Sequence, residues 1–219
     1  MMRTILTLSV AFGFSAVHAA VVPFTEDFPS DSAHWRDAFG LAELGWQATG
    51  GPDGGSYAFG TFNFVHSNEN DTPAILRAHD EWNSSNNAFV GDWLADGVTQ
   101  FSVMVRHDAP VPLTYFVRFA GPANFPGAAG VGFVPVMPGA WTPITIDIDP
   151  NNPAIVLEGV PFDAVFSNIG HVQIGVMVPA DLAGLDQTFT FDVDKVSIVP
   201  EPAALALLVV GLVGLRRRA

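Results

Sequence analysis

Apolar side chains recur at every second position in five segments of this chain, and no other feature constrains its fold as strongly. Successive side chains of a β-strand point to opposite faces, so this period predicts strands with one buried and one accessible face. The five segments are 101–105, 113–119, 144–148, 172–178 and 189–193. After the last one the apolar phase shifts to Val196 and Ile198, so we expect a β-bulge near Asp194 and Lys195.

Turn-forming residues separate the segments, for example at 50–55 (Gly-Gly-Pro-Asp-Gly-Gly) and 149–153 (Asp-Pro-Asn-Asn-Pro). No helical period of similar strength lies between them. Of the 219 residues, 49% are hydrophobic, so the chain can bury a core. We therefore expect an all-β protein with one antiparallel, jelly-roll-like β-sandwich over residues 20–198.

Charge and motif content exclude several functions. There are 9 Lys and Arg residues against 22 Asp and Glu residues, and the net charge of -13 argues against nucleic acid as a partner. The absence of cysteine excludes disulfides and thiolate sites. The sequence has no H-E-x-x-H motif, no G-x-S-x-G elbow and no phosphate-binding glycine loop, so we expect no catalysis. The alternative is a secreted polysaccharide-degrading enzyme that uses a carboxylate pair, such as Asp80 with Glu81.

The N-terminus has the three parts of a secretory signal peptide. Arg3 precedes the uncharged stretch 5–17, and Val17-His18-Ala19 places small side chains where signal peptidase reads them. We expect a signal peptide at residues 1–19 with cleavage after Ala19, or after Ala20 as the alternative. Another interpretation is a buried N-terminal helix. Signal peptidase is therefore an expected partner, and the protein is expected to be exported.

The C-terminus combines three features in a fixed order. The tripeptide Pro200-Glu201-Pro202 is followed by an apolar run at 203–215 and then by Arg216, Arg217 and Arg218. The prolines keep the backbone around Glu201 extended and accessible. The apolar run would be about 20 Å long as a helix, against a hydrocarbon core of about 30 Å, so it needs its flanks to span a membrane. The arginines can reach the headgroups and hold the end of this hydrophobic helix on the cytoplasmic side.

This tail, residues 199–219, resembles the PEP-CTERM sorting signal of exported bacterial proteins. The resemblance implies that an exosortase is a partner, that the inner membrane holds the precursor transiently, and that cleavage occurs near Pro200, Glu201 and Pro202. The released protein would then reach the cell surface, the exopolysaccharide matrix or the medium. The alternative is a plain C-terminal membrane anchor without processing.

Two edge segments of the central domain resemble jelly-roll carbohydrate-binding modules. They are 24–28 (Phe-Thr-Glu-Asp-Phe), followed by Trp35, and 191–196 (Phe-Asp-Val-Asp-Lys-Val). In such modules, acidic residues of the first and last strands often hold a structural Ca²⁺. The resemblance implies Glu26 and Asp194 as ligands, with Asp192 or Asp27 as a further one. The alternative is that these carboxylates are solvated residues at strand ends.

A second acidic pattern has the spacing of an EF-hand loop. It comprises Asp147, Asp149, Asn151 and Glu158. Pro150 and the strand pattern before it oppose the winding of such a loop, so we expect a polar turn after a strand.

A sugar-binding face needs aromatic planes beside groups that can bond to hydroxyls. Trp82 and Trp93 lie next to Asn and Asp residues and are the first candidates, with Tyr57 third. Trp35, Trp46 and Trp141 are assigned to core or edge packing. Taken together, the sequence predicts an exported, noncatalytic surface or exopolysaccharide-matrix protein, with polysaccharide as its candidate ligand.

Overall fold

The structure is a computed structural model that describes residues 19–200. The predicted signal peptide, apart from Ala19, lies outside the described residues. Most of the predicted sorting signal also lies outside them, including Glu201, Pro202 and the arginines at 216–218. Within residues 19–200, no helix is long and apolar enough to cross a membrane.

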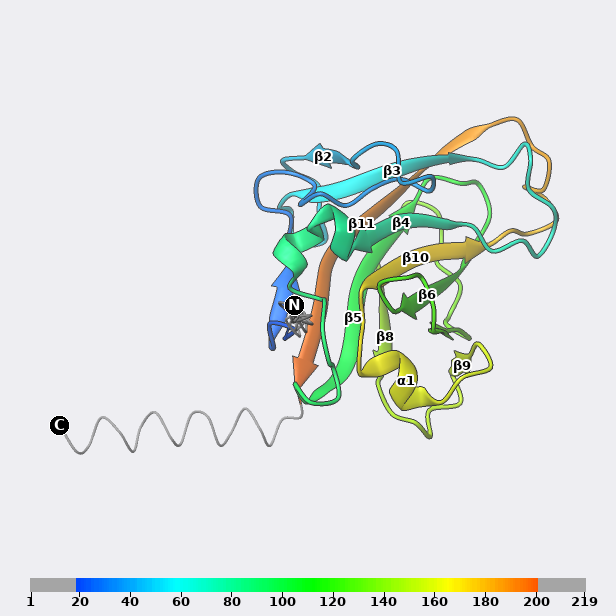
Figure 1. The fold of residues 1–219 in the computed structure, drawn as a ribbon. Helices are drawn as coiled ribbons and strands as arrows, with labels where there is room; N and C mark the ends of the chain where they lie inside the picture. The colour runs from blue at the N-terminus through cyan, green and yellow to red at the C-terminus, as the bar shows by residue number, and fades with distance from the viewer. Residues whose placement is uncertain (1–18, 201–219) are drawn as a thin grey trace, which may run out of the picture.

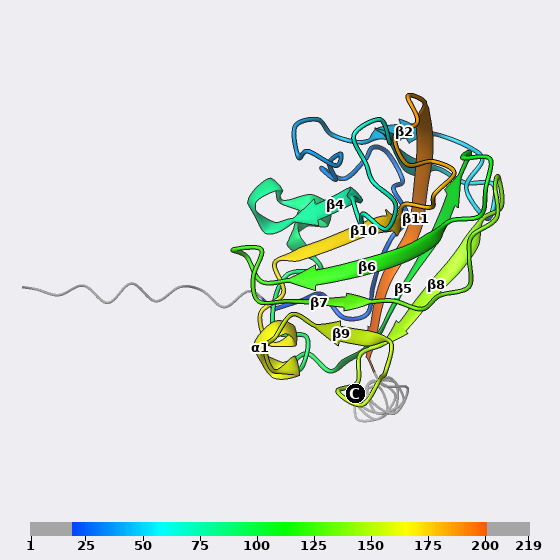
Figure 2. The ribbon, with the colours of Figure 1, turned by 90° about the vertical axis from the view of Figure 1, so that its right-hand side faces the viewer.

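Two antiparallel sheets face each other, as Figures 1 and 2 show from two sides. The six-stranded sheet has the order β2 (Gly45–Gln47), β3 (Tyr57–Asn63), β11 (Thr188–Pro200), β5 (Val98–His107) and β8 (Thr142–Asp147), and β1 (Phe24–Glu26) also pairs with β11. The five-stranded sheet has the order β4 (Ala74–His79), β10 (His171–Met177), β6 (Thr114–Ala120), β7 (Gly127–Gly130) and β9 (Ile155–Leu157). The predicted all-β, antiparallel sandwich is confirmed.

Within the described residues, helical structure is confined to short connections. These are α1 (Phe162–Phe166) and the 3₁₀ turns η1 (Asp80–Trp82) and η2 (Ser84–Asn87), which follow β4 directly. Because η1 begins where β4 ends, its side chains lie at the rim of the five-stranded sheet. This position brings them next to the first residue of β10.

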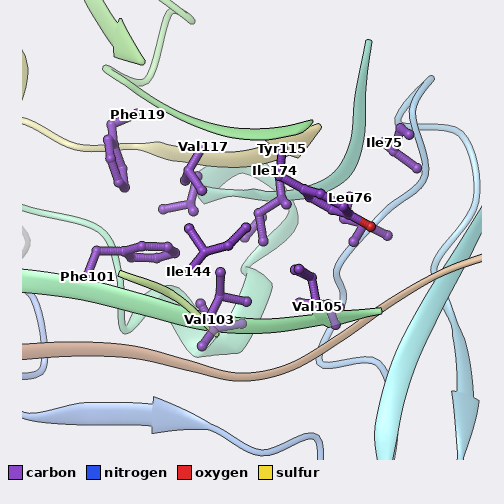
Figure 3. Packing of buried hydrophobic residues seen from close by; sticks show 14 of the residues in the cluster. Ile75, Leu76, Phe101, Val103, Val105, Tyr115, Val117, Phe119, Ile144 and Ile174 are labelled. Atoms are coloured by element: carbon purple, nitrogen blue, oxygen red, sulfur yellow. The ribbon is translucent and has the colours of Figure 1, made fainter. Parts of the chain in front are cut away.

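The core lies between the sheets and is built by the alternation seen in the sequence. In β6, Tyr115, Val117 and Phe119 are at most 2% exposed, whereas the residues between them are only half-buried. Figure 3 shows these side chains opposite Phe101 and Val103 of β5, which are equally buried. Burial of each large apolar side chain contributes about 1.5–3 kcal/mol to stability.

The expected bulge is present in β11. The pairing of β11 with β5 shifts register between Asp194 and Ser197, and Lys195 has a left-handed backbone with φ of 48°. The extra residue returns Val196 to the core side of the sheet, while Asp194 stays opposite Met104 on the outer face. The phase shift in the sequence therefore marks a real change of face.

Both ends of the described chain lie at the same end of the sandwich. The backbone N–H of Ala20 donates a hydrogen bond of 2.7 Å to a carboxylate oxygen of Asp96. Two residues further along, Val98 pairs with Pro200, the last residue of β11. The chain therefore enters and leaves the domain beside the start of β5.

Candidate functional site

The outer face of the five-stranded sheet carries a cleft of about 540 Å³. Three polar side chains cross its floor in one row, because Arg77 of β4, Gln173 of β10 and Arg118 of β6 are paired in register. The cleft is lined by Thr72, Pro73, Ala74, Arg77, Thr114, Tyr115, Phe116, Arg118, Asn124, Ala129, Val131, Gly132, Glu158, Gln173 and Met177. Figure 2 shows the strands of this sheet side by side.

Arg118 is fixed in the middle of the cleft by partners on three segments. Its guanidinium donates to both carboxylate oxygens of Glu158, one of them at 2.8 Å, and to Oδ1 of Asn124 at 2.7 Å. It also donates to Oε1 of Gln173 at 3.2 Å. Its hydrogen bonds hold the pKa of Glu158 below the usual value, so the carboxylate stays charged. A side chain at Gly127 would displace the ends of both side chains of this ion pair, so the glycine leaves room for their present arrangement.

Most of the remaining lining of the cleft is apolar. Phe116 of β6 lies across β10 at Gly175, where any Cβ would collide with the aromatic ring. Met177 and Val131 extend the apolar surface on either side. An apolar floor with a few fixed planar hydrogen-bonding groups suits a sugar, which offers a C–H face and a rim of hydroxyls.

One end of the polar row continues into a stack of rings. His79, the last residue of β4, pairs with His171, the first residue of β10, and their rings stack with centroids 3.6 Å apart. Trp82 of η1 stacks on the other face of His79 at 4.0 Å, and the Arg36 guanidinium lies 5.0 Å from the centroid of the Trp82 ring. The stack joins the cleft through Gln173, whose Nε2 is 2.9 Å from Nε2 of His79.

Two carboxylates face this stack. Glu81 lies 2.9 Å from Nδ1 of His79 and, through its other oxygen, 2.9 Å from Nε2 of His171. Burial lowers the pKa of His79 to about 4, so its ring is neutral at pH 7. Burial by itself would raise the pKa of Glu81, but its hydrogen bonds with His79, with the backbone and with Asp80 together outweigh it and lower that pKa to about 2. Burial also raises the pKa of Asp80 beside it.

Trp93, the second predicted ligand-binding residue, is a core residue instead. Its side chain is fully buried, and its ring packs against Phe101, Phe119 and Phe166. The indole N–H donates to the carbonyl of Phe89 at 2.8 Å, so its polar group is also satisfied inside the protein. A ligand on the surface cannot reach this ring.

Neither Trp82 nor Tyr57 offers a free ring face to the cleft. Trp82 is covered by His79 on one side and by Arg36 on the other. Tyr57 lies on the six-stranded sheet, where the Arg106 guanidinium is 5.0 Å from its ring centroid and Trp141 packs edge-on at 5.5 Å. The three aromatic candidates are therefore spread over the core, the rim of one sheet and the other sheet.

The sequence carried a signal for the residues that do line the cleft. Thr114, Phe116 and Arg118 alternate with the core residues of β6, and Gln173 is the single polar residue inside an apolar strand segment. These positions were recognisable as the outer face of two strands. That the two strands are neighbours, with Arg118 opposite Gln173, follows only from the pairing of β6 with β10.

The three predicted calcium ligands do not converge on one point. Glu26 is opposite Val196, on the side of the sheet that carries the core, and accepts a hydrogen bond from the backbone N–H of Phe28. Asp192 and Asp194 point to the outer face, where Asp192 bonds to Arg106 at 2.6 Å. Calcium binding therefore stays a prediction that the described side chains do not by themselves favour.

The EF-hand spacing belongs to a polar turn, as expected. The backbone N–H of Asn152 donates to the carbonyl of Asp149 at 3.0 Å, which closes the turn after β8. Glu158, the residue in the last ligand position of the pattern, is committed to Arg118 in the cleft.

Asp194 makes the stability of the domain depend on pH. Burial raises the pKa of this carboxyl from 3.8 to about 6, so folding favours its protonated form. That stabilisation is complete below pH 3.8 and is lost as the pH rises through 6. Between pH 4 and pH 8 the wild-type protein should lose about 2–3 kcal/mol of unfolding free energy through this group, and Asp194→Asn should not show this loss. Urea unfolding without calcium measures both proteins.

Asp181→Asn is the matched control for this prediction, because Asp181 is exposed. It should keep the full pH dependence of the wild-type protein, and an unchanged slope in Asp194→Asn would contradict the assignment. Added Ca²⁺ at pH 8 tests the calcium prediction in the same assay. A melting shift that disappears in Asp194→Asn would support it.

Comparisons with known proteins agree on the fold. No protein-family model and no curated protein sequence matches the chain. An exo-β-agarase structure superimposes with a TM-score of 0.51 at 10% identity, over 81% of this chain and 25% of that one. The N-terminal CBM22-1 and GH10 modules of a Clostridium thermocellum xylanase give a TM-score of 0.48 at 16% identity, over 83% of this chain and 29% of that one.

A further structure matches over nearly its whole length. The C-terminal family 22 carbohydrate-binding module of a Clostridium thermocellum protein gives a TM-score of 0.45 at 13% identity, over 84% of this chain and 98% of that chain. Identities this low bear on the fold alone. The sandwich fold of this chain therefore also occurs in the exo-β-agarase structure. The chain spans 29% and 25% of the length of the first two matched chains.

Proposed function

We propose that the exported domain is a noncatalytic polysaccharide-binding protein and that the cleft of the five-stranded sheet holds the sugar chain. The observation that carries the proposal is Arg118, fixed by Glu158, Asn124 and Gln173 above an apolar floor. All five N–H groups of Arg118 are used in bonds within the protein, so its part is to hold the oxygens of Glu158, Asn124 and Gln173 in place. Immobile acceptors can bind hydroxyl groups without a large loss of side-chain entropy. Some of the similar structures are carbohydrate-binding modules by name, but the proposal rests on the cleft.

A neutral polysaccharide fits this protein better than an acidic one. The chain has a net charge of -13, so its overall field repels anionic polymers. Of the two arginines on the floor of the cleft, Arg118 is already neutralised by Glu158. We therefore expect binding that depends on hydroxyl contacts and changes little with salt concentration.

Affinity electrophoresis in gels containing single polysaccharides tests the proposal. The protein without its signal peptide and tail should be retarded by at least one neutral glycan, such as a β-glucan or a xylan, and not by an alginate. Chromatography of the same glycans after incubation should show no shorter products. Retardation by no neutral glycan would contradict the proposal, and glycan shortening would favour the enzyme alternative.

We also propose that the precursor is processed at both ends, as the two terminal signals predict. Two features of the described domain support this route. The Pro-Glu-Pro motif starts at the last residue of β11, so cleavage there leaves the sandwich complete. Cleavage after Ala19 would turn the N–H of Ala20, 2.7 Å from Asp96, into an ammonium group that pairs with this carboxylate.

Intact mass and cell fractionation in the native host test the processing route, with a Glu201→Ala variant beside the wild type. The wild-type protein should begin near Ala20, end near Pro-Glu-Pro and leave the inner membrane. The variant should keep its tail and stay in that membrane. If both proteins keep residues 216–218 and remain membrane-bound, the tail is a plain anchor.

A further inference from the structure

We propose that the cleft selects a polysaccharide with a neutral main chain and isolated carboxylate groups, and that Arg77 binds one of these carboxylates. A uronate branch is a substituent of this kind. The inference rests on the proposed function and narrows its substrate class. The hydroxyl contacts of the neutral main chain stay as described above, and the carboxylate adds one charged contact to them.

Basic residues are rare in this domain, yet most of them gather on one sheet face. Of the nine Lys and Arg residues of the chain, five lie within residues 19–200. Three of these five stand in one row across the outer face of the five-stranded sheet, where Arg36 is paired with Arg77, Arg77 with Gln173, and Gln173 with Arg118. An otherwise acidic domain therefore carries a strip of arginines, and this strip crosses the cleft.

Arg77 is the member of this row without a counter-ion. The guanidinium groups of Arg36 and Arg118 have the partners described above. Within residues 19–200, the guanidinium of Arg77 makes one long hydrogen bond, from Nε to the carbonyl of Ala74 at 3.5 Å, and no ion pair. Arg77 also lines the cleft. Its two terminal nitrogens are therefore available to a ligand.

The charge of Arg77 is unfavourable in its present surroundings. Burial lowers the pKa of Arg77, and the charge of Arg118 acts in the same direction. Asp37 opposes this shift only in part, and its carboxylate accepts hydrogen bonds from backbone N–H groups of its own turn. Arg36 adds a like charge directly opposite Arg77, an arrangement that destabilises paired strands. An anion bound to Arg77 would relieve these costs.

A carboxylate on a sugar matches the free side of this guanidinium. The terminal nitrogens of an arginine form a planar fork that can donate two parallel hydrogen bonds to a carboxylate. Gln173, the next residue in the row, offers its amide to neighbouring hydroxyls, and Phe116 and Met177 line the same cleft with apolar surface. One sugar ring can therefore use all three kinds of contact.

The rest of the domain limits how many acidic groups the glycan can carry. The net charge of -13 repels a polymer that is charged at every sugar. Glu158 occupies the cleft beside Arg118 and would repel a second carboxylate there. A neutral main chain with scattered acidic branches satisfies both conditions.

Titration calorimetry tests the inference on the chain from Ala20 to its natural end, kept in detergent. The probes are pairs of oligosaccharides that differ in one carboxylate: xylotetraose with and without a glucuronate branch, and cellotetraose with and without one glucose oxidised at C6. The wild-type protein should bind the acidic member of the pair that matches its glycan about tenfold more tightly. At about 1 M salt, where the Debye length is about 3 Å, most of this preference should disappear.

Arg77→Gln should bind both members of a pair equally, and Arg77→Lys should keep part of the preference, because it keeps the charge but loses the fork. Arg36→Gln is the matched control. It removes the same charge from the residue directly opposite Arg77, but Arg36 does not line the cleft. It should keep the preference of the wild type. Arg77 is only half-buried, so its variants should keep the wild-type melting temperature, which is measured beside each titration.

Two results would overturn the inference and leave the proposed function intact. The first is equal binding of both members of the pair by the wild-type protein. The second is an equal loss of preference in Arg77→Gln and Arg36→Gln, which would mean that the acidic member responds to the overall charge. Binding of no oligosaccharide at all would instead contradict the proposed function, and this inference with it.

Discussion

Replacing Trp93 by alanine is expected to lower the free energy of unfolding by about 3–5 kcal/mol. The side chain is fully buried and contacts three phenylalanine rings from β5, β6 and α1. Removing it leaves a large cavity and also deprives the carbonyl of Phe89 of its donor. Urea unfolding followed by circular dichroism measures the change.

Trp141→Ala is the control for this prediction. Trp141 is only half-buried and packs on the outer face of the six-stranded sheet against Tyr57. Its loss should cost about 1 kcal/mol or less, in the range of surface substitutions. If Trp93→Ala kept its stability but lost glycan retardation, Trp93 would contact the ligand and our core assignment would be wrong.

Replacing Arg118 by alanine is expected to reduce polysaccharide affinity by at least about tenfold, because it removes the group that organises the cleft. Glu158, Asn124 and Gln173 would all lose their shared donor. Arg118→Lys should restore the charge but only part of the affinity, since an ammonium group cannot hold three segments in a plane. Affinity electrophoresis against the responsive glycan measures each variant.

Arg106→Ala is the matched control for Arg118→Ala. Arg106 also stands on an outer sheet face and is also paired with a carboxylate, that of Asp192. It lies over the rings of Tyr57 and Trp141 on the six-stranded sheet. We expect Arg106→Ala to bind glycan like the wild type. A larger loss of glycan affinity in Arg106→Ala than in Arg118→Ala would indicate that the glycan binds to the six-stranded sheet.

The two variants also separate binding from folding. Arg118 is 18% exposed and tied to a loop residue, so its loss can loosen the loop at Asn124. Melting temperatures of the arginine variants should therefore be measured with the affinities. A fall in affinity at unchanged melting temperature shows that Arg118 acts on the cleft and not on the stability of the fold.

Local alternation predicted five of the eleven strands, namely β5, β6, β8, β10 and β11. The alternation around Val117 predicted a strand with a buried and an accessible face, because a side chain's face depends only on its place in the pleat. The phase shift near Lys195 predicted the bulge for the same reason. Local patterns failed for Trp93, because the polar residues beside it in the sequence do not show whether the ring turns inward.

The sequence by itself determined the fold class, the alternating faces of the strands and the strong excess of acidic charge. Its two terminal segments also predict export and sorting. Only the tertiary structure placed Arg118 beside Gln173, and His79 beside His171, because each pair joins residues more than 50 positions apart through strand pairing. The order of strands in a sheet depends on how the whole core packs, so no local pattern could show that these polar residues share one face.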